Sequence, residues 1–136
     1  MTLYQYQGLE HISYCSQFNK ELSKLFGKST KNEAEYKIWL YTKLLFLNNY
    51  GLNAALSQMP NNFELLIPHS ENLHCIRHTG FEGNPRIIFF PLHENDVENE
   101  VLVVAFQEKQ TSSDYQNAIT KACARKNEIL AARTEK

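Results

Sequence analysis

The chain has 136 residues, of which 43% are hydrophobic and 21% are charged, and its net charge is -1. This size and composition are those of one globular domain that covers residues 1–136. The near-neutral charge excludes strong nonspecific attraction to nucleic acid, so any site for a polyanion must come from local clustering of cations.

The cysteines and the apolar segments indicate the compartment. Cys15, Cys75 and Cys123 have no paired spacing, which predicts reduced thiols rather than disulfides or a zinc site. The N-terminus has no charged segment followed by an apolar run, and every apolar stretch is too short for a membrane span. We therefore expect a cytoplasmic protein without membrane association, metal or cofactor.

The first half of the chain predicts one strand and two helices. Residues 9–14 alternate weakly between apolar and polar, as a half-buried strand does. Residues 16–26 switch to the helical period, and Gly27 is a plausible stop. A polar stretch precedes a second helix of roughly five turns, which we expect to end near Gly51. The apolar stripe of this helix consists of Tyr36, Trp39, Leu40, Leu44 and Leu47.

The second half is rich in β-branched and aromatic residues, which favour strands. Residues 63–67 form a short apolar run. Residues 73–78 are expected to pair with 86–92, because the loop between them contains two glycines and a proline. Residues 101–106 are expected to pair with 86–92 as well, across an acidic loop at 93–100.

The last predicted element is a helix that begins at a capping box. Ser113 is the expected N-cap, and Gln116 is its partner three residues later. The order is then strand, two helices, three strands and one helix. This order predicts an α+β fold in which helices pack on one face of a small antiparallel sheet.

Cations and a phenol fall at the ends of these predicted elements. Arg77 and Arg86 lie near the two ends of one hairpin loop, so we expect them to approach each other. Two like charges that close are unfavourable unless an anion lies between them. Lys109 and Gln110 follow the last strand, and Tyr115 lies on the first turn of the last helix, whose N-terminus attracts phosphate. The pattern therefore predicts a site for a phosphate-bearing ligand.

The same residues carry a resemblance to a known family. Leu73 to Arg77 fits a Leu-x-x-Ile/Leu-Arg pattern, and the run Phe-Gln-Glu-Lys-Gln at 106–110 is similar to Gly-Phe-x-Lys-Lys-x-x-Gln. In these motifs the chain resembles the RelE/ParE superfamily of bacterial toxin–antitoxin toxins, especially its HigB-like branch. The likeness covers the last half of the chain well and the first half weakly. It implies the architecture of RelE-like toxins and microbial ribonucleases, with two N-terminal helices and a C-terminal helix on the sheet.

The resemblance implies an activity and its residues. The toxin of a type II toxin–antitoxin system would inhibit translation as a ribosome-dependent mRNA endoribonuclease. By motif position, the residues that look catalytic are Arg86, Lys109 and Tyr115. The residues that look RNA-binding are Arg77, His74, His78 and Gln110. The partners implied are mRNA, the ribosome, and a cognate antitoxin that often binds DNA and is encoded in the same operon.

The implied reaction needs no metal, because the RNA 2′-OH attacks the adjacent phosphate. It requires a base for the 2′ proton, cations for the phosphoryl charge and an acid for the leaving oxygen. Arg86 and Lys109 would stabilise charge. The base stays open between His74, His78 and Tyr115, although an imidazole titrates nearer to neutral pH than a phenol does.

Departures from the family leave other interpretations open. RelE carries lysines on the strand that here holds Leu73 to Cys75, and this chain lacks them. A ParE-like inhibitor of DNA gyrase would share the fold, and a non-catalytic, degenerate toxin would act as a binding protein. Arg77 and Arg86 are also compatible with simple surface ion pairs to Glu82 or the acidic loop, which contribute about 0–1 kcal/mol each.

Overall fold

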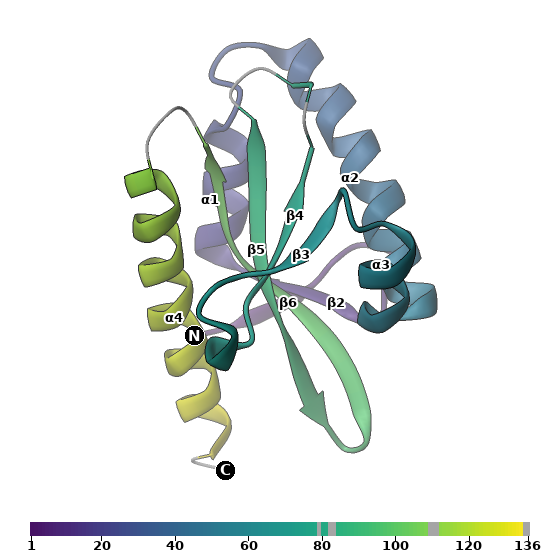
Figure 1. Ribbon diagram of the computed structural model, residues 1–136, viewed down its shortest axis with the longest axis vertical. Coiled ribbons are helices and arrows are strands. Elements are labelled where there is room, and N and C mark those ends of the chain that lie inside the picture. Colours follow the sequence, from purple (N-terminus) through teal and green to yellow (C-terminus); the bar gives the residue numbers. More distant parts are fainter. Residues whose placement is uncertain (79, 82–83, 109–111, 135–136) are drawn as a thin grey trace.

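The computed structural model contains one β-sheet and four α-helices within the described residues (Figure 1). The structure describes residues 1–78, 80–81, 84–108 and 112–134. The elements in chain order are β1 (Leu3–Gln5), β2 (Ile12–Cys15), α1 (Ser16–Lys24), α2 (Thr30–Tyr50), α3 (Leu52–Gln58), β3 (Phe63–Leu65), a short 3₁₀ helix (His69–Glu71), β4 (His74–Arg77), β5 (Pro85–Glu94), β6 (Val97–Gln107) and α4 (Ser112–Thr134).

The sheet is mixed rather than antiparallel. Within the described residues it has six strands in the order β1-β2-β6-β5-β4-β3, and β2 pairs with β6 in parallel. The α+β class is as predicted, but the purely antiparallel sheet is wrong. Strands β1 and β2 also precede the first helices, so the chain does not open on two helices. A three-residue strand such as β1 is too short to show a period, and parallel pairing leaves no local sequence signal.

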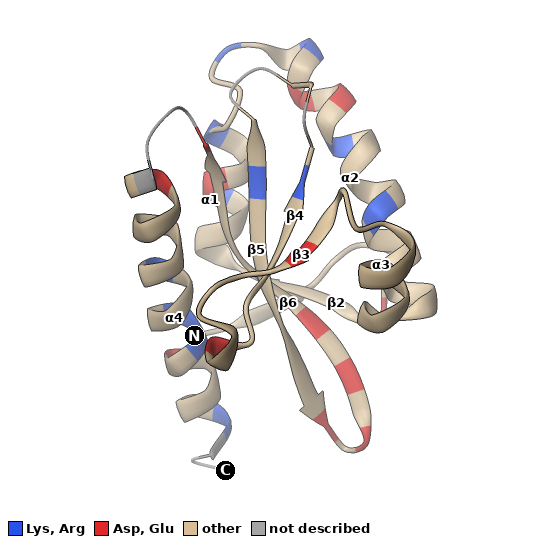
Figure 2. Cartoon of the chain, in the orientation of Figure 1, with Lys and Arg blue, Asp and Glu red and all other residues tan. Residues whose placement is uncertain are grey.

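The acidic segment 93–100 is not a loop. Strand β5 continues to Glu94 and β6 starts at Val97, so the two strands form one long hairpin. Only Asn95 and Asp96 turn the chain, with φ values of 53° and 63°. Asn and Asp tolerate this left-handed conformation, and two such residues make the turn that suits the twist of a hairpin. The acidic residues of this hairpin are the red bands at the bottom of Figure 2.

Helices lie on both sides of the sheet. In Figure 1, α4 lies in front of it and α1 and α2 lie behind. The stripe predicted for α2 is largely buried, and its fully buried members are Tyr36, Leu40, Leu44 and Leu47. Helix α2 begins at Thr30, where the Ser29 hydroxyl accepts a hydrogen bond from the Asn32 N–H at 3.4 Å. Helix α4 begins at Ser112, one residue before the predicted N-cap.

Helices α1 and α4 meet at the edge of β6, beyond the end of β2. The Glu21 carboxylate accepts a hydrogen bond from the Ala105 N–H at 3.2 Å, and Arg125 donates to the Val103 carbonyl at 2.6 Å. Gln107 donates to the Leu25 carbonyl. Glu21 and Arg125 therefore satisfy backbone groups of β6 that a neighbouring strand would otherwise pair, which protects this edge from strand addition. Across the described part of the chain, no helix has both the length and the apolar content that crossing a membrane requires.

Candidate functional site

Arg86 is the centre of a polar cluster at one end of the sheet. It lies near the start of β5, paired in register with Arg77 on β4 and Phe106 on β6. Although charged, it is only 6% exposed. Its Nε and Nη2 donate to the same oxygen of Glu108, at 3.2 and 2.9 Å, and its Nη1 donates to the His78 carbonyl at 3.4 Å. A buried guanidinium is thus held by one carboxylate oxygen and one backbone carbonyl.

Tyr115 brings a phenol to this guanidinium from the first turn of α4. Its hydroxyl accepts a hydrogen bond from Arg86 Nε at 3.1 Å and donates to Glu64 Oε1 at 3.5 Å. The hydroxyl also lies 4.0 Å from Cys75 Sγ. The ring packs edge-on against Phe106, with centroids 5.3 Å apart. The phenol therefore connects an arginine on β5 with a carboxylate on β3.

Arg77 completes the cluster on the neighbouring strand. Its Nη1 lies 3.3 Å from Glu64 Oε2, and its Nε donates to the Asn61 carbonyl at 3.1 Å. The side chains of Arg77 and Glu64 are 34% and 31% exposed, so this pair faces solvent while Arg86 does not. The register pair of Arg77 and Arg86 places the two guanidinium groups on the same face of the sheet.

Two carboxylates of the chain itself pair with Arg77 and Arg86, which the sequence predicted would bind an anionic ligand. Arg86 is paired with Glu108 and Arg77 with Glu64, so these four side chains carry no net charge. Sequence reasoning missed both acids. Glu64 lies in the run Phe-Glu-Leu of β3, which was interpreted only as a short apolar strand. Glu108 lies inside the family-like motif, in which the neighbouring Lys109 was the predicted functional residue.

Burial keeps the phenol and the thiol of this cluster protonated. Burial raises the pKa of Tyr115 well above its usual range; nearby Cys75 adds to this, and Arg86 opposes it. Burial and the Glu64 carboxylate raise the pKa of Cys75 to about 12. Burial disfavours the charged form of Arg86, but hydrogen bonding to Tyr115 and Glu108 outweighs it and raises the pKa of Arg86. At neutral pH the phenol is thus a proton donor rather than a base.

The two predicted histidines occupy different surroundings. The His78 ring packs against Trp39 and Phe81, with centroids 4.3 and 4.7 Å away, and its backbone carbonyl is the group that contacts Arg86. His74 lies at the opposite end of β4 from Arg77.

His74 is held in an apolar position rather than in the cluster. It is only 3% exposed and stacks on Phe89 at 5.6 Å. Its Nε2 lies 3.0 Å from Asn72 Oδ1. Burial, with a smaller effect of Lys126, lowers the pKa of His74 to about 4. It is therefore neutral at pH 7, and the structure does not bring it to Arg86.

Lys109, Gln110 and Glu82 lie outside the described residues. Within the described ranges, no group of three or more His, Cys, Asp or Glu side chains is placed to hold a metal ion. Comparison of the sequence with protein-family models and with curated proteins found no match.

Proposed function

We propose that the chain is the toxin of a type II toxin–antitoxin system, with the RelE-like architecture that its motifs resemble, and that it cleaves mRNA on the ribosome in the cytoplasm. The observation that carries this proposal is the 3.1 Å contact between the Arg86 guanidinium and the Tyr115 hydroxyl. An arginine and a phenol from different elements meet there, beside a second arginine and a solvent-accessible carboxylate. These are the groups that metal-independent cleavage of a phosphodiester requires.

The proposed reaction starts from the RNA 2′-OH. The Glu64 carboxylate takes the 2′ proton while the 2′ oxygen attacks phosphorus, and Arg77 and Arg86 stabilise the added negative charge on the phosphoryl oxygens. The bond from phosphorus to the 5′ oxygen then breaks, and Tyr115 gives its proton to that oxygen. The products are a 2′,3′-cyclic phosphate and a 5′-hydroxyl.

The proton balance closes within the cluster. Glu64 Oε1 lies 3.5 Å from the Tyr115 oxygen, so the proton taken by Glu64 can return to the phenolate. A carboxylate base replaces His74 in this proposal, because His74 is buried at the end of β4 opposite Arg77 and cannot reach a phosphate bound there. The phosphate must also displace Glu108 from Arg86, since both need the same guanidinium edge.

The matched charges of the cluster also favour a second candidate, a non-catalytic toxin that only binds its target. Arg77 and Arg86 each already have a carboxylate partner, which weakens their attraction for a phosphate. A ParE-like action on gyrase has no such support from the cluster. A cognate antitoxin remains the expected partner under either candidate.

The decisive experiment adds the purified chain to translating ribosomes with a defined mRNA and maps the new ends. We expect fragments with 2′,3′-cyclic phosphate and 5′-hydroxyl termini. Tyr115→Phe should cut at least tenfold more slowly, because a single acid–base group contributes about 10²–10⁴-fold. Tyr50→Phe, which removes the hydroxyl of an exposed tyrosine at the end of α2, is the matched control. Intact mRNA together with inhibited supercoiling by gyrase would replace this proposal with the ParE-like one, and intact mRNA with neither effect would favour the binding protein.

A further inference from the structure

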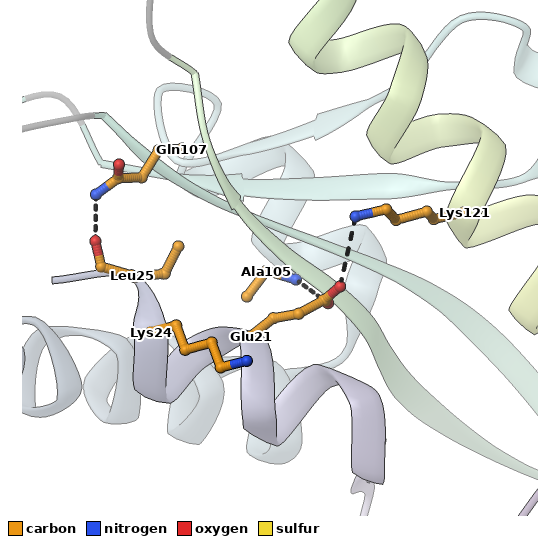
Figure 3. A pocket seen from close by; sticks show the side chains of 6 residues that line it. All are labelled: Glu21, Lys24, Leu25, Ala105, Gln107 and Lys121. Atoms are coloured by element: carbon orange, nitrogen blue, oxygen red, sulfur yellow. Dashed lines mark hydrogen bonds and ion pairs between the residues drawn. The ribbon is translucent and has the colours of Figure 1, made fainter. Parts of the chain in front are cut away.

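A second polar pocket lies where α1 and α4 meet the edge of β6. Its volume is about 270 Å³, and its lining consists of Glu21, Lys24, Leu25, Ala105, Gln107 and Lys121. In Figure 3, Lys121 extends from α4 toward Glu21, and Lys24 extends from α1 beside the Glu21 side chain. Hydrogen bonds fix the side chains of the floor. Glu21 accepts from the Ala105 N–H of β6, and Gln107 donates to the carbonyl of Leu25, the C-cap of α1.

The pocket carries an excess of positive charge. Arg125 binds both oxygens of Glu21, at 2.8 and 2.9 Å, and the Ala105 N–H also donates to this carboxylate. Lys121 lies 3.8 Å from Glu21 and is 58% exposed, so its contact is long and weak. Lys24 has no ion-pair partner among the described side chains. Three cations therefore surround one carboxylate whose acceptor capacity is already used.

This charge distribution differs from that of the Arg86 cluster. There, two arginines are matched by two carboxylates. Here, one carboxylate faces Arg125, Lys121 and Lys24, which leaves two positive charges in excess. In a chain of net charge -1, such an excess is the local clustering that attraction of a polyanion requires.

The pocket lies beside the proposed site rather than within it. Gln107, in its lining, follows Phe106 on β6, so the two side chains leave the strand on opposite faces. A neighbouring pocket of about 200 Å³ shares Gln107 and Lys121, and it includes the acid Asp114 and Phe106, the residue on which Tyr115 packs. Tyr115 and Lys121 are six residues apart on α4, which is about 9 Å along a helix.

We propose that this pocket binds a backbone phosphate of the RNA strand a few nucleotides from the scissile phosphate, with Lys24 and Lys121 as its ligands. The inference deepens the proposed function and rests on it for the identity of the ligand as RNA. Lysines act as point charges toward phosphate and read no base, so the pocket sets affinity and register rather than sequence preference. It supplies the attraction that the neutral Arg86 cluster lacks.

The test measures binding apart from cleavage. The probe is a fluorescent single-stranded RNA with 2′-O-methyl groups, which cannot be cut, and its Kd is measured by anisotropy over a range of salt concentrations. We expect the double variant Lys24→Gln/Lys121→Gln to bind about tenfold more weakly, with a salt dependence that is shallower by about 0.7 because the contact with one phosphate is lost. The control Lys31→Gln/Lys37→Gln makes the same charge change on α2 and should bind nearly as the wild type does.

Each outcome decides the inference separately from the proposed function. Equal weakening in both double variants would overturn it, since net charge alone would then explain the effect. Unchanged binding in Lys24→Gln/Lys121→Gln would also overturn it, even if that variant still cleaved mRNA. Selective weakening would support the pocket even if the wild type proved unable to cleave. A glutamate-rich peptide serves as the second probe, and loss of peptide binding without loss of RNA binding would assign the pocket to an acidic protein segment instead.

Discussion

Two of the arginine–carboxylate pairs, Arg125–Glu21 and Arg86–Glu108, differ in geometry. Arg125 and Glu21 form a two-pronged pair, at 2.8 and 2.9 Å, in which each carboxylate oxygen has its own nitrogen. Arg86 directs two nitrogens at a single oxygen of Glu108 and shares one of them with Tyr115. The first geometry satisfies both groups, whereas the second leaves the carboxylate only half used.

The exposures of the partners point the same way. Glu21 is 21% exposed and also accepts a hydrogen bond from the Ala105 N–H of β6. Removal of Arg125 would therefore leave a partly buried carboxylate without its main cationic partner. Glu108 is 35% exposed, so water can replace Arg86 around it. We infer that the pair at the α1–α4 junction holds these elements together, whereas the carboxylate at the sheet end can be exchanged. An exchangeable counter-ion is what a phosphate ligand would need.

The largest expected effect is on cleavage. Arg86→Gln removes the buried cation that faces the phosphoryl oxygens in the proposed reaction, and we expect the rate of mRNA cleavage to fall about 10²–10³-fold, as for loss of a charge-stabilising donor. The measurement is the rate of fragment formation on translating ribosomes. A rate within threefold of the wild type would show that Arg86 is only a structural ion pair.

The next prediction compares the Arg125–Glu21 and Arg86–Glu108 pairs by the free energy of unfolding that each loses when its arginine is replaced. We expect Arg125→Gln to lower the free energy of unfolding by about 3 kcal/mol, because it leaves the partly buried Glu21 without its main partner. Arg86→Gln should cost about 1–2 kcal/mol, since Glu108 can be rehydrated. Urea unfolding of both variants at one pH checks the order. If Arg86→Gln were the more damaging change, the assignment of structural and exchangeable pairs would have to be reversed.

His74 is a buried ionisable group that has no carboxylate partner among the described side chains. Its pKa of about 4 in the fold lies below the value near 6.5 of an unfolded chain. Between these values the unfolded state binds the proton and the folded state does not, so the free energy of unfolding falls as the pH drops from about 6.5 to 4. We expect a loss of up to about 3 kcal/mol relative to pH 7. His74→Leu should lack this component, and parallel pH dependences of the two proteins in urea would contradict it.

The sequence predicted the parts of the fold whose signals are local. The stripe of α2, the hairpin that joins β4 to β5 and the helix that begins near Ser113 all show periods or turn residues, and each is found near its predicted place. The approach of Arg86 and Tyr115 followed from motif order and is observed at 3.1 Å. The roles of these residues stay predictions.

The missed features depend on long-range pairing. Strand β1 is too short to show a period, and the weak alternation that predicted β2 does not indicate its parallel pairing with β6. Glu64 meets Arg77 only because β3 pairs with β4. The acidic segment was taken for a loop because charges dominate it, yet only two of its residues turn the chain. The net charge of the chain likewise does not reveal the excess of cations at the α1–α4 junction, which arises because the two helices pack at the same edge of β6.

The smallest expected effect tests whether Glu108 is the exchangeable partner. Glu108→Gln keeps the shape of the side chain and removes the charge that competes with phosphate for Arg86, so we expect a 2′-O-methyl RNA to bind about fivefold more tightly, on the order of 1 kcal/mol. Glu98→Gln makes the same charge change on the hairpin, where Glu98 pairs with His93 at 2.9 Å. Equal tightening in both variants would reflect net charge alone. Tightening confined to Glu108→Gln would mean that the carboxylate and the RNA compete for one guanidinium, and would mark the Arg86 cluster as the place where the backbone enters.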